Sequence, residues 1–435
     1  MEQKFLIKGG RPLEGEIEIR GAKNAASKLM IASLLTQEPC VLENVPLSSE
    51  IEMTKELCES VGSKVTLGDD HTAHISTPEI TTSLVPELSR KNRIPILAFG
   101  PLLHRKGFAE VPVMGGCYLG HRPINFHLEA LNKMGVRVER REASYYAQAD
   151  HIVGATIDLP YPSVGATENV LLTAVRADGV THITNAAMEP EILNLVDMLN
   201  AMGGDIAVDF DARGIRIEGV SKLKGVHIRV IPDRNEIVSF AAAALATDGR
   251  IMIRGVENTA LETFLASVRA IGGVALEHKG GIEFSGRRPY KPTIIETGPH
   301  PAFMTDWQQP FCILLTQADG ESIIHETVYD DRFAYTKDLK RMGANVEVTD
   351  ECLSDMPCRF HGATFNHSVR IKGHTPLTGT EITMTDLRAG MAHMIAAFAA
   401  KGESLISGIA HVERGYEKID ERLRSLGADI QRVTA

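Results

Sequence analysis

Six segments of the chain share one pattern, in which an amphipathic helix ends on a glycine and runs directly into a strand. The glycines are spaced by 73, 68, 69, 71 and 84 residues, and they are Gly62, Gly135, Gly203, Gly272, Gly343 and Gly427. Glycine commonly follows the last turn of a helix because it adopts the left-handed conformation without steric cost. One copy would mean little, but six at near-regular spacing predict a repeated fold.

A nearly apolar helix opens each repeat. These helices are expected to begin near residues 21, 92, 165, 233, 305 and 385, and short strands such as RIMIRGV follow them. Helices that are apolar on all sides must be buried on most of them. The pattern therefore predicts an α/β unit of buried helix, strand, amphipathic helix and strand, with antiparallel or mixed sheets outside and helices inside. Six such units fit most simply into two domains of three.

The last spacing is longer than the others, and its excess falls in residues 352–379. We interpret this segment as a loop insertion or an extended hairpin. It contains Cys352, Cys358, His361 and His367, but their spacing fits no common zinc module. A surface loop is therefore the preferred interpretation, and no metal site is assigned.

Composition and charge narrow the classes of function. The chain has 435 residues, 43% of them apolar, which is enough for the cores of two or three domains. Its 46 basic and 56 acidic residues give a net charge of −10, which argues against nucleic-acid or membrane partners. We find no signal sequence or spanning segment, and the six cysteines are scattered. We expect a cytoplasmic, monomeric protein with reduced thiols.

Basic residues stand in the first turns of several buried helices, namely Lys23, Arg93, Arg234 and Arg388. Cations are unfavourable there because the helix macrodipole is positive at its N-terminus, so these residues suggest a bound anion. Thr305, Thr385 and Asp233, in contrast, are expected to be ordinary N-caps. A cleft formed by such helix starts would be positive despite the net charge of the chain.

A cysteine lies among three glycines in MGGCYLGHRP, residues 114–123. His121 and Arg122 are close in sequence to this Cys117 and could lower the pKa of its thiol toward a reactive thiolate. From these residues alone, a reactive thiol and an inert cysteine both remain open.

Nine motifs, taken in order along the whole chain, resemble the UDP-N-acetylglucosamine 1-carboxyvinyltransferases, a family of enolpyruvyl transferases. They are GAKNAA, GGCYLGHRP, SVGAT, EPEI, PDR, PHPAFMTDWQ, DDRF, TDLRA and HVERGYEKIDERLRSLGA. The resemblance implies transfer of the enolpyruvyl group from phosphoenolpyruvate to the 3-hydroxyl of UDP-N-acetylglucosamine, the step that begins peptidoglycan synthesis, with no cofactor.

The same resemblance implies a two-domain inside-out α/β barrel of six repeated units. Residues 22–231 would form an N-terminal domain with the Cys117 loop, and residues 1–21 with 232–435 a C-terminal domain. The active site would lie in the cleft between them.

The resemblance also implies roles for individual residues. Cys117 would act as the acid and could add to phosphoenolpyruvate, Asp306 would take the proton of the sugar hydroxyl, and Lys23 and Arg414 would complete the catalytic set. Phosphoenolpyruvate would be held by Lys23, Asn24, Arg122 and Arg414. The other substrate contacts would be Arg93, Pro123, Ile124, Asn125, Phe126, Tyr161, Pro162, Ser163, Val164, Gly165, Val328, Arg332, Asp386 and Arg388.

Two positions depart from the family pattern on the nucleotide side. Asn125 stands where the family usually has an aspartate that contacts the uracil end, and Tyr161, followed by Pro162, stands where a lysine is common near the diphosphate. A different nucleotide sugar is therefore the alternative acceptor. Shikimate 3-phosphate is disfavoured, because the enzymes that use it typically have a serine-containing lysine motif where this chain has Lys23 and Asn24, and they lack the Cys117 loop. A non-catalytic nucleotide-sugar sensor is a further alternative, and the presence of Lys23, Cys117 and Asp306 together argues against it.

Overall fold

The computed structural model describes residues 2–89, 92–113, 124–256, 260–353 and 358–434. These residues fold into two compact units. The N-terminal unit is the described part of residues 21–231, and the C-terminal unit joins the described parts of residues 1–20 and 232–435. Each unit has its own hydrophobic core.

The N-terminal unit contains three sheets among its described residues. Their strand orders are β13-β3-β5-β4, β6-β8-β7 and β11-β12-β10-β9. The strands are β3 (Cys40–Glu43), β4 (Lys64–Leu67), β5 (Ala73–Ser76), β6 (Phe108–Pro112), β7 (Arg137–Arg140), β8 (Ser144–Gln148), β9 (Thr156–Asp158), β10 (Val180–Thr184), β11 (Asp205–Asp209), β12 (Gly214–Glu218) and β13 (His227–Arg229). The helices are α1 (Lys23–Ala32), η1 (Ser33–Leu35), α2 (Ser49–Ser60), η2 (Ile94–Ala98), α3 (Phe99–Lys106), α4 (Asn125–Lys133), α5 (Val164–Ala174) and α6 (Pro190–Ala201).

The C-terminal unit repeats this plan with the sheets β21-β22-β1-β23, β15-β16-β14-β2 and β17-β18-β20-β19. Its strands are β1 (Gln3–Lys8), β2 (Glu14–Glu18), β14 (Arg250–Arg254), β15 (Val274–His278), β16 (Gly281–Ser285), β17 (Ile294–Glu296), β18 (Gly320–His325), β19 (Asn345–Thr349), β20 (Ser368–Gly373), β21 (Glu381–Thr383), β22 (Glu403–Ser407) and β23 (Asp429–Thr434). Its helices are α7 (Arg234–Ala246), α8 (Glu262–Ala270), η3 (Thr305–Trp307), α9 (Gln308–Thr316), α10 (Thr336–Arg341), α11 (Leu387–Ala399), η4 (Ile409–Arg414) and α12 (Ile419–Ser425).

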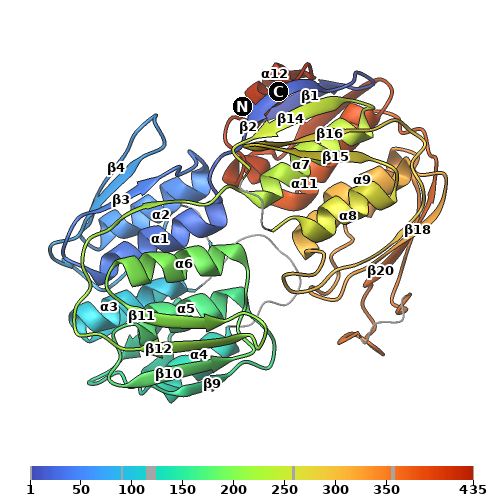
Figure 1. The fold of residues 1–435 in the computed structure, drawn as a ribbon. Coiled ribbons are helices and arrows are strands. Elements are labelled where there is room, and N and C mark those ends of the chain that lie inside the picture. The colour runs from blue at the N-terminus through green and yellow to red at the C-terminus, as the bar shows by residue number, and fades with distance from the viewer. Residues whose placement is uncertain (1, 90–91, 114–123, 257–259, 354–357, 435) are drawn as a thin grey trace. The chain divides into compact units, whose positions relative to one another are not determined.

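The apolar helices are buried, as their sequences predict. Every residue of α7 and of α9 is buried, and α7, α9 and α11 pack against one another in the core of the C-terminal unit. Sheets cover these helices from outside, as Figure 1 shows for β14, β16, β18 and β20. Even so, within the described residues no helix is both long and apolar enough to cross a membrane.

Among the described strands, five of the sheets contain one parallel pair, and in two of these sheets the parallel neighbour comes from a distant part of the chain. In the C-terminal unit, β2 runs parallel to β14 with Ile17 opposite Ile253, whereas β1 runs antiparallel to both β22 and β23. The first twenty residues therefore supply strands to two sheets of the C-terminal unit, where β1 lies beside the last strands of the chain (Figure 1).

The six repeat glycines all adopt positive φ angles, from +87° at Gly135 to +114° at Gly62. This conformation turns the chain from each amphipathic helix into the next strand without a Cβ clash. The repeat predicted from the glycine spacing is therefore present at every expected position.

The segment that causes the longer last spacing is shorter than the predicted insertion over residues 352–379. Residues 368–373 of that segment form β20, which pairs with both β18 and β19 in the sheet β17-β18-β20-β19. The added length is in the connection 350–367 between β19 and β20. The equivalent strands β11 and β12 are joined by a short turn, with Asp209 opposite Gly214.

Close backbone packing at Gly219 gives a test of the fold. A Cβ at Gly219 would lie 1.6 Å from the Ala177 carbonyl oxygen, whereas a Cβ at Gly214 would meet nothing closer than 3.7 Å. We expect Gly219→Ala to lower the free energy of unfolding by about 3 kcal/mol through overpacking. Gly214→Ala, on the preceding strand, should change it by less than about 0.5 kcal/mol. Equal urea midpoints for the two variants would contradict this packing.

Candidate active site

A carboxylate held by two buried arginines forms the centre of the C-terminal unit's candidate site. Asp306 lies in η3, just before the buried helix α9. Arg332 Nη2 donates to Asp306 Oδ1 at 2.7 Å, and Arg388 Nε donates to Asp306 Oδ2 at 3.1 Å. The Asp306 side chain keeps 24% of its surface exposed, but those of Arg332 and Arg388 keep only 1% and 7%. The carboxylate is thus reachable from solvent while both cations are fixed behind it.

The two arginines determine the charge of this carboxylate. Burial acts to raise the pKa of Asp306, but the charges of Arg388 and Arg332 outweigh it and hold that pKa well below the usual range. Asp306 is therefore an anion at neutral pH and, while both arginines contact it, a weak base.

Arg332 is positioned by a buried network that the sequence did not reveal. Its Nη1 donates to Thr305 Oγ1 at 2.6 Å, and Thr305 Oγ1 in turn donates to Glu326 Oε2 at 2.8 Å. Glu326 is completely buried, and its Oε1 accepts from the backbone N–H of Val328 at 2.8 Å. Glu326 thus links the Asp306 site to the predicted substrate contact Val328. It gives no recognisable sequence signal, because its partners are brought together only by folding.

Arg388 is fixed at the first turn of α11. Asp386 is the N-cap of this helix, and its Oδ1 accepts from the backbone N–H groups of Arg388 and Ala389 at 2.9 and 3.0 Å. The guanidinium also donates to the Tyr416 hydroxyl at 3.1 Å. This geometry gives Asp386 a capping function, and its predicted contact with substrate stays a prediction.

Two expected caps are wrong, and one is confirmed. Asp233 caps α7 by accepting from two backbone N–H groups. Thr385 is not the cap of α11, because Asp386 occupies that position. Thr305 lies inside η3, and its hydroxyl serves the buried Glu326 instead. Arg234 is buried with its guanidinium 5.9 Å from the centre of the Trp307 ring, so packing accounts for its position.

Arg414 is the last residue of η4 in the same unit and is partly buried. The remaining described candidates belong to the N-terminal unit. Lys23 and Asn24 begin α1, where no side chain caps the helix, and Lys23 Nζ lies 3.9 Å from Glu50 Oε1. Arg93 directly precedes η2.

The predicted nucleotide-side residues gather at the starts of α4 and α5, two helices that pack against each other. Ser163 caps α5 by accepting from the Ala166 N–H at 3.4 Å, and Tyr161 and Pro162 immediately precede it. Gly165 leaves room for the buried His127 of α4, because a Cβ there would lie 3.1 Å from His127 Cε1. This histidine was not predicted from the sequence.

The residues at the start of α4 were also predicted to contact the nucleotide sugar. Phe126 packs against the core of the N-terminal unit, as Val164 does from α5. Ile124 occupies the N-cap position, and the exposed Asn125 donates through Nδ2 to Glu129 Oε1 at 3.5 Å. Cys117, Arg122 and Pro123 lie outside the described residues, so their assignments stay predictions.

A separate cluster lies at one end of the sheet β17-β18-β20-β19. Cys352, Cys358 and His367 come together with His325 of β18, and their possible ligand atoms all lie within 4.8 Å of one another. His361, which belongs to the sequence pattern, is not part of this set. Most described residues of the connection 350–367 are exposed or partly buried, as expected for a surface loop, but His367 at its end is completely buried.

Known proteins resemble this chain along nearly its whole length. A sequence model of the EPSP synthase (3-phosphoshikimate 1-carboxyvinyltransferase) family matches residues 7–423. UDP-N-acetylglucosamine 1-carboxyvinyltransferase of Protochlamydia amoebophila is 45% identical, covering 98% of this chain and 94% of that relative. The enzyme of the same name from Carboxydothermus hydrogenoformans is 40% identical, covering 99% of this chain and 98% of that relative.

Solved structures show the same fold at lower identity. The enolpyruvyl transferase NikO from Streptomyces tendae has a TM-score of 0.86 at 22% identity, covering 100% of this chain and 99% of that protein. EPSP synthase from Acinetobacter baumannii has a TM-score of 0.75 at 17% identity, with both chains fully covered. The predicted enolpyruvyl transferase fold and the family resemblance are both confirmed.

Glu168 gives a pH-dependent test of the N-terminal unit. Burial raises the pKa of Glu168 in α5 to about 7, although Lys28 Nζ at 3.8 Å opposes the shift. Because the folded pKa exceeds the unfolded one, ionisation of Glu168 costs stability. That cost is absent below about pH 4.5, grows as the pH rises, and is complete above about pH 7.

Glu168→Gln should therefore raise the free energy of unfolding by about 3 kcal/mol at pH 8 and leave it unchanged at pH 4.5. Glu52→Gln, at an exposed position on α2, is the control and should show no such pH dependence. The free energy of unfolding of both variants is measured as a function of pH by urea denaturation. A Glu168→Gln effect of the same size at both pH values would contradict the account.

Proposed function

The chain belongs to the UDP-N-acetylglucosamine 1-carboxyvinyltransferase family, and we propose that it transfers the enolpyruvyl group of phosphoenolpyruvate to the 3-hydroxyl of UDP-N-acetylglucosamine, releasing phosphate. The relatives of that name, at 40–46% identity along nearly the whole chain, support the reaction and its acceptor. The observation that supports the site is the carboxylate of Asp306 held between Arg332 and Arg388. The likeness to the solved structures concerns the fold and does not favour another acceptor.

The proposed chemistry has three steps. A proton is added to the methylene carbon of phosphoenolpyruvate, and the sugar hydroxyl attacks the resulting cationic carbon and loses its own proton. Phosphate then leaves the tetrahedral adduct while its methyl group loses a proton, which restores the C=CH₂ double bond of the enolpyruvyl ether. We assign the first proton to Cys117 and the second to Asp306. Acid and base groups placed in this way contribute about 10²–10⁴-fold each to the rate of such steps.

The ionised state of Asp306 suggests how the site is switched on. A carboxylate with two guanidinium groups against it binds a proton weakly. The phosphate and carboxylate of the substrates carry negative charges that compete for the same cations. In this proposal the substrates draw Arg332 or Arg388 away from Asp306, and its basicity rises when the hydroxyl to be deprotonated is in place.

We propose the substrate contacts that the family resemblance implies. Lys23, Asn24, Arg122 and Arg414 hold phosphoenolpyruvate, whereas Arg93, Val328 and residues 123–126 and 161–165 contact the nucleotide sugar. Both substrates are small molecules, the reaction requires neither a metal nor an organic cofactor, and a monomer suffices. We place the reaction in the cytoplasm, in agreement with the described cysteines, which are all free thiols.

The proposed function is tested by mass spectrometry of the product. Incubation with phosphoenolpyruvate and UDP-N-acetylglucosamine should give the enolpyruvyl ether of the sugar and one phosphate per product. Shikimate 3-phosphate and a second UDP-sugar, offered separately, should remain unchanged. Product from either of these, and none from UDP-N-acetylglucosamine, would overturn the acceptor.

Replacement of the proposed base gives a sharper test. Asp306→Asn keeps the shape of the side chain but cannot accept the proton, so kcat should fall by about 10³-fold while UDP-N-acetylglucosamine still binds. Asp338→Asn is the matched control, since Asp338 also pairs with an arginine, Arg341, at 2.9 Å in the C-terminal unit, and it should keep near-normal kcat. Normal turnover in Asp306→Asn would reduce Asp306 to a structural partner of the arginines.

Substitutions of Tyr161 test the proposed contact with the nucleotide sugar. A tyrosine hydroxyl offers a diphosphate one neutral hydrogen bond, whereas a charge-assisted bond is roughly twice as strong. Tyr161→Lys should therefore tighten the binding of UDP-N-acetylglucosamine or leave it unchanged, and Tyr161→Phe should weaken it, both measured by calorimetry. The acceptor assignment fails if the wild-type protein does not bind UDP-N-acetylglucosamine even at millimolar concentration.

A further inference from the structure

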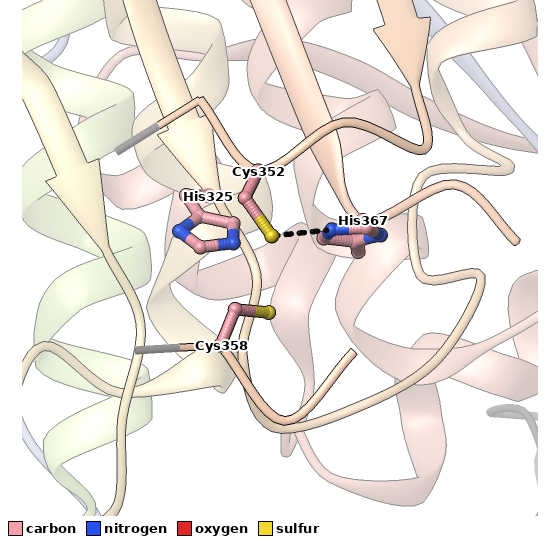
Figure 2. Close-up of side chains that lie close together, drawn as sticks. All are labelled: His325, Cys352, Cys358 and His367. Carbon is pink, nitrogen blue, oxygen red and sulfur yellow. Dashed lines mark hydrogen bonds between the residues drawn. The ribbon is translucent and has the colours of Figure 1, made fainter. Parts of the chain in front are cut away.

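Two histidines and two cysteines converge at one end of the sheet β17-β18-β20-β19. Figure 2 shows His325, Cys352, Cys358 and His367 directed toward a common centre, and their possible ligand atoms all lie within 4.8 Å of one another. We propose that these four side chains bind one Zn²⁺ ion. This site is separate from the proposed enolpyruvyl transfer, and nothing in that reaction requires it.

The spacing of the donor atoms fits a tetrahedral zinc ion. With Zn–S near 2.3 Å and Zn–N near 2.0 Å, neighbouring ligand atoms lie about 3.3–3.8 Å apart. Cys352 Sγ is 3.4 Å from His367 Nε2. A set of two sulfur and two nitrogen donors is typical of zinc, and four protein ligands complete the coordination shell. The ion would therefore be structural, with no position left for water or substrate.

The sheet register, rather than the sequence spacing, assembles the site. His325 is the last residue of β18 and lies opposite Ser368, the first residue of β20. Thr349, the last residue of β19, also lies opposite Ser368. Strand ends that meet in this way place His325 and His367 beside the connection that carries Cys352 and Cys358.

Both histidines present the correct nitrogen to the centre. His367 Nδ1 lies 3.1 Å from the Phe365 carbonyl oxygen, to which it donates, so Nε2 keeps its lone pair for a metal. His325 Nδ1 lies 3.5 Å from Glu296 Oε1. A carboxylate or carbonyl behind the metal-binding imidazole is the usual support of such ligands.

The two cysteines are also available to bind a metal. Neither forms a disulfide, and both are partly buried beside fully buried histidines. The backbone N–H of Phe360 donates to Cys358 Sγ at 3.3 Å. Hydrogen bonds from the surrounding chain to the ligand residues are common at metal sites.

The location explains what the ion would do. The connection 350–367 is long, and among its described residues only Phe360 and His367 are buried. A metal bound by its two cysteines and its last residue would fix it to the sheet. Arg359, next to Cys358, donates to the carbonyl oxygen of Val328, and the Glu326 N–H donates to the His367 carbonyl oxygen at 2.8 Å. The ion would therefore also stabilise the segment that holds Val328.

The metal content of the full chain, purified under reducing conditions without chelator and reconstituted with excess Zn²⁺, tests the proposal. After removal of unbound metal, we expect inductively coupled plasma mass spectrometry to find one zinc per chain. Cys352→Ser and Cys358→Ser should each lose it. His361→Ala is the matched control: its Nδ1 lies 3.8 Å from Cys352 Sγ, but it stands outside the proposed set, so the variant should keep the zinc.

Two further measurements apply if a variant folds poorly. Co²⁺ in place of Zn²⁺ should give the thiolate charge-transfer and intense visible bands of a tetrahedral site in the wild-type protein. Glu296→Gln, which changes no ligand, should weaken zinc binding by about 10-fold or more in competition with a chelating dye. The proposal is overturned if the wild-type protein retains no zinc, if the Cys→Ser variants retain as much, or if Cys352 and Cys358 form a disulfide under these conditions.

Discussion

The pairing of Asp306 with Arg332 and Arg388 is the interaction on which the candidate active site depends. Two guanidinium groups that are almost completely buried require negative charge close by, because an uncompensated buried cation is strongly destabilising. Asp306 supplies that charge in the free protein. Its carboxylate is also the only member of the three with appreciable exposure, so it is the group that meets a ligand first.

The supports of the two arginines come from different repeats of the same unit. Arg332 is held through Thr305 and Glu326, and Arg388 through the first turn of α11 and the Tyr416 hydroxyl. All-round burial of α7, α9 and α11 fixes the positions of the helix starts. Site residues placed at such ends have a rigid support although they lie in short 3₁₀ turns and loops. The inside-out arrangement of the fold thus leads directly to the location of its polar centre.

Much of the fold was predictable because it depends on local signals repeated six times. The glycines after the amphipathic helices and the apolar composition of the central helices are visible in the sequence, and both predictions are confirmed. The identity of individual caps was less predictable: Thr385 and Asp386 are adjacent and both suitable, and the fold uses Asp386. The supporting residue Glu326 was missed, because its polar partners come from η3 and the chain after β18.

The cysteine and histidine cluster illustrates the same limit. The sequence pattern contained three of its four members but included His361, which is close in sequence, rather than His325, which is close in space. Pairing of β18 with β20 brings His325 to the site from a distant position. Assignments that depend on Cys117, Arg122 and Pro123 remain predictions from the resemblance, since these residues are outside the described parts of the chain.

The most direct test of the account is the pKa of the Asp306 carboxyl, followed by NMR of the selectively labelled protein with and without substrates. The account predicts a pKa well below the usual aspartate range in the free protein, raised when UDP-N-acetylglucosamine and an unreactive analogue of phosphoenolpyruvate are bound. The shift should be lost in Asp306→Asn, which identifies the signal. An ordinary aspartate pKa in the free protein, or one that the ligands leave unchanged, would contradict the control of Asp306 by Arg332 and Arg388.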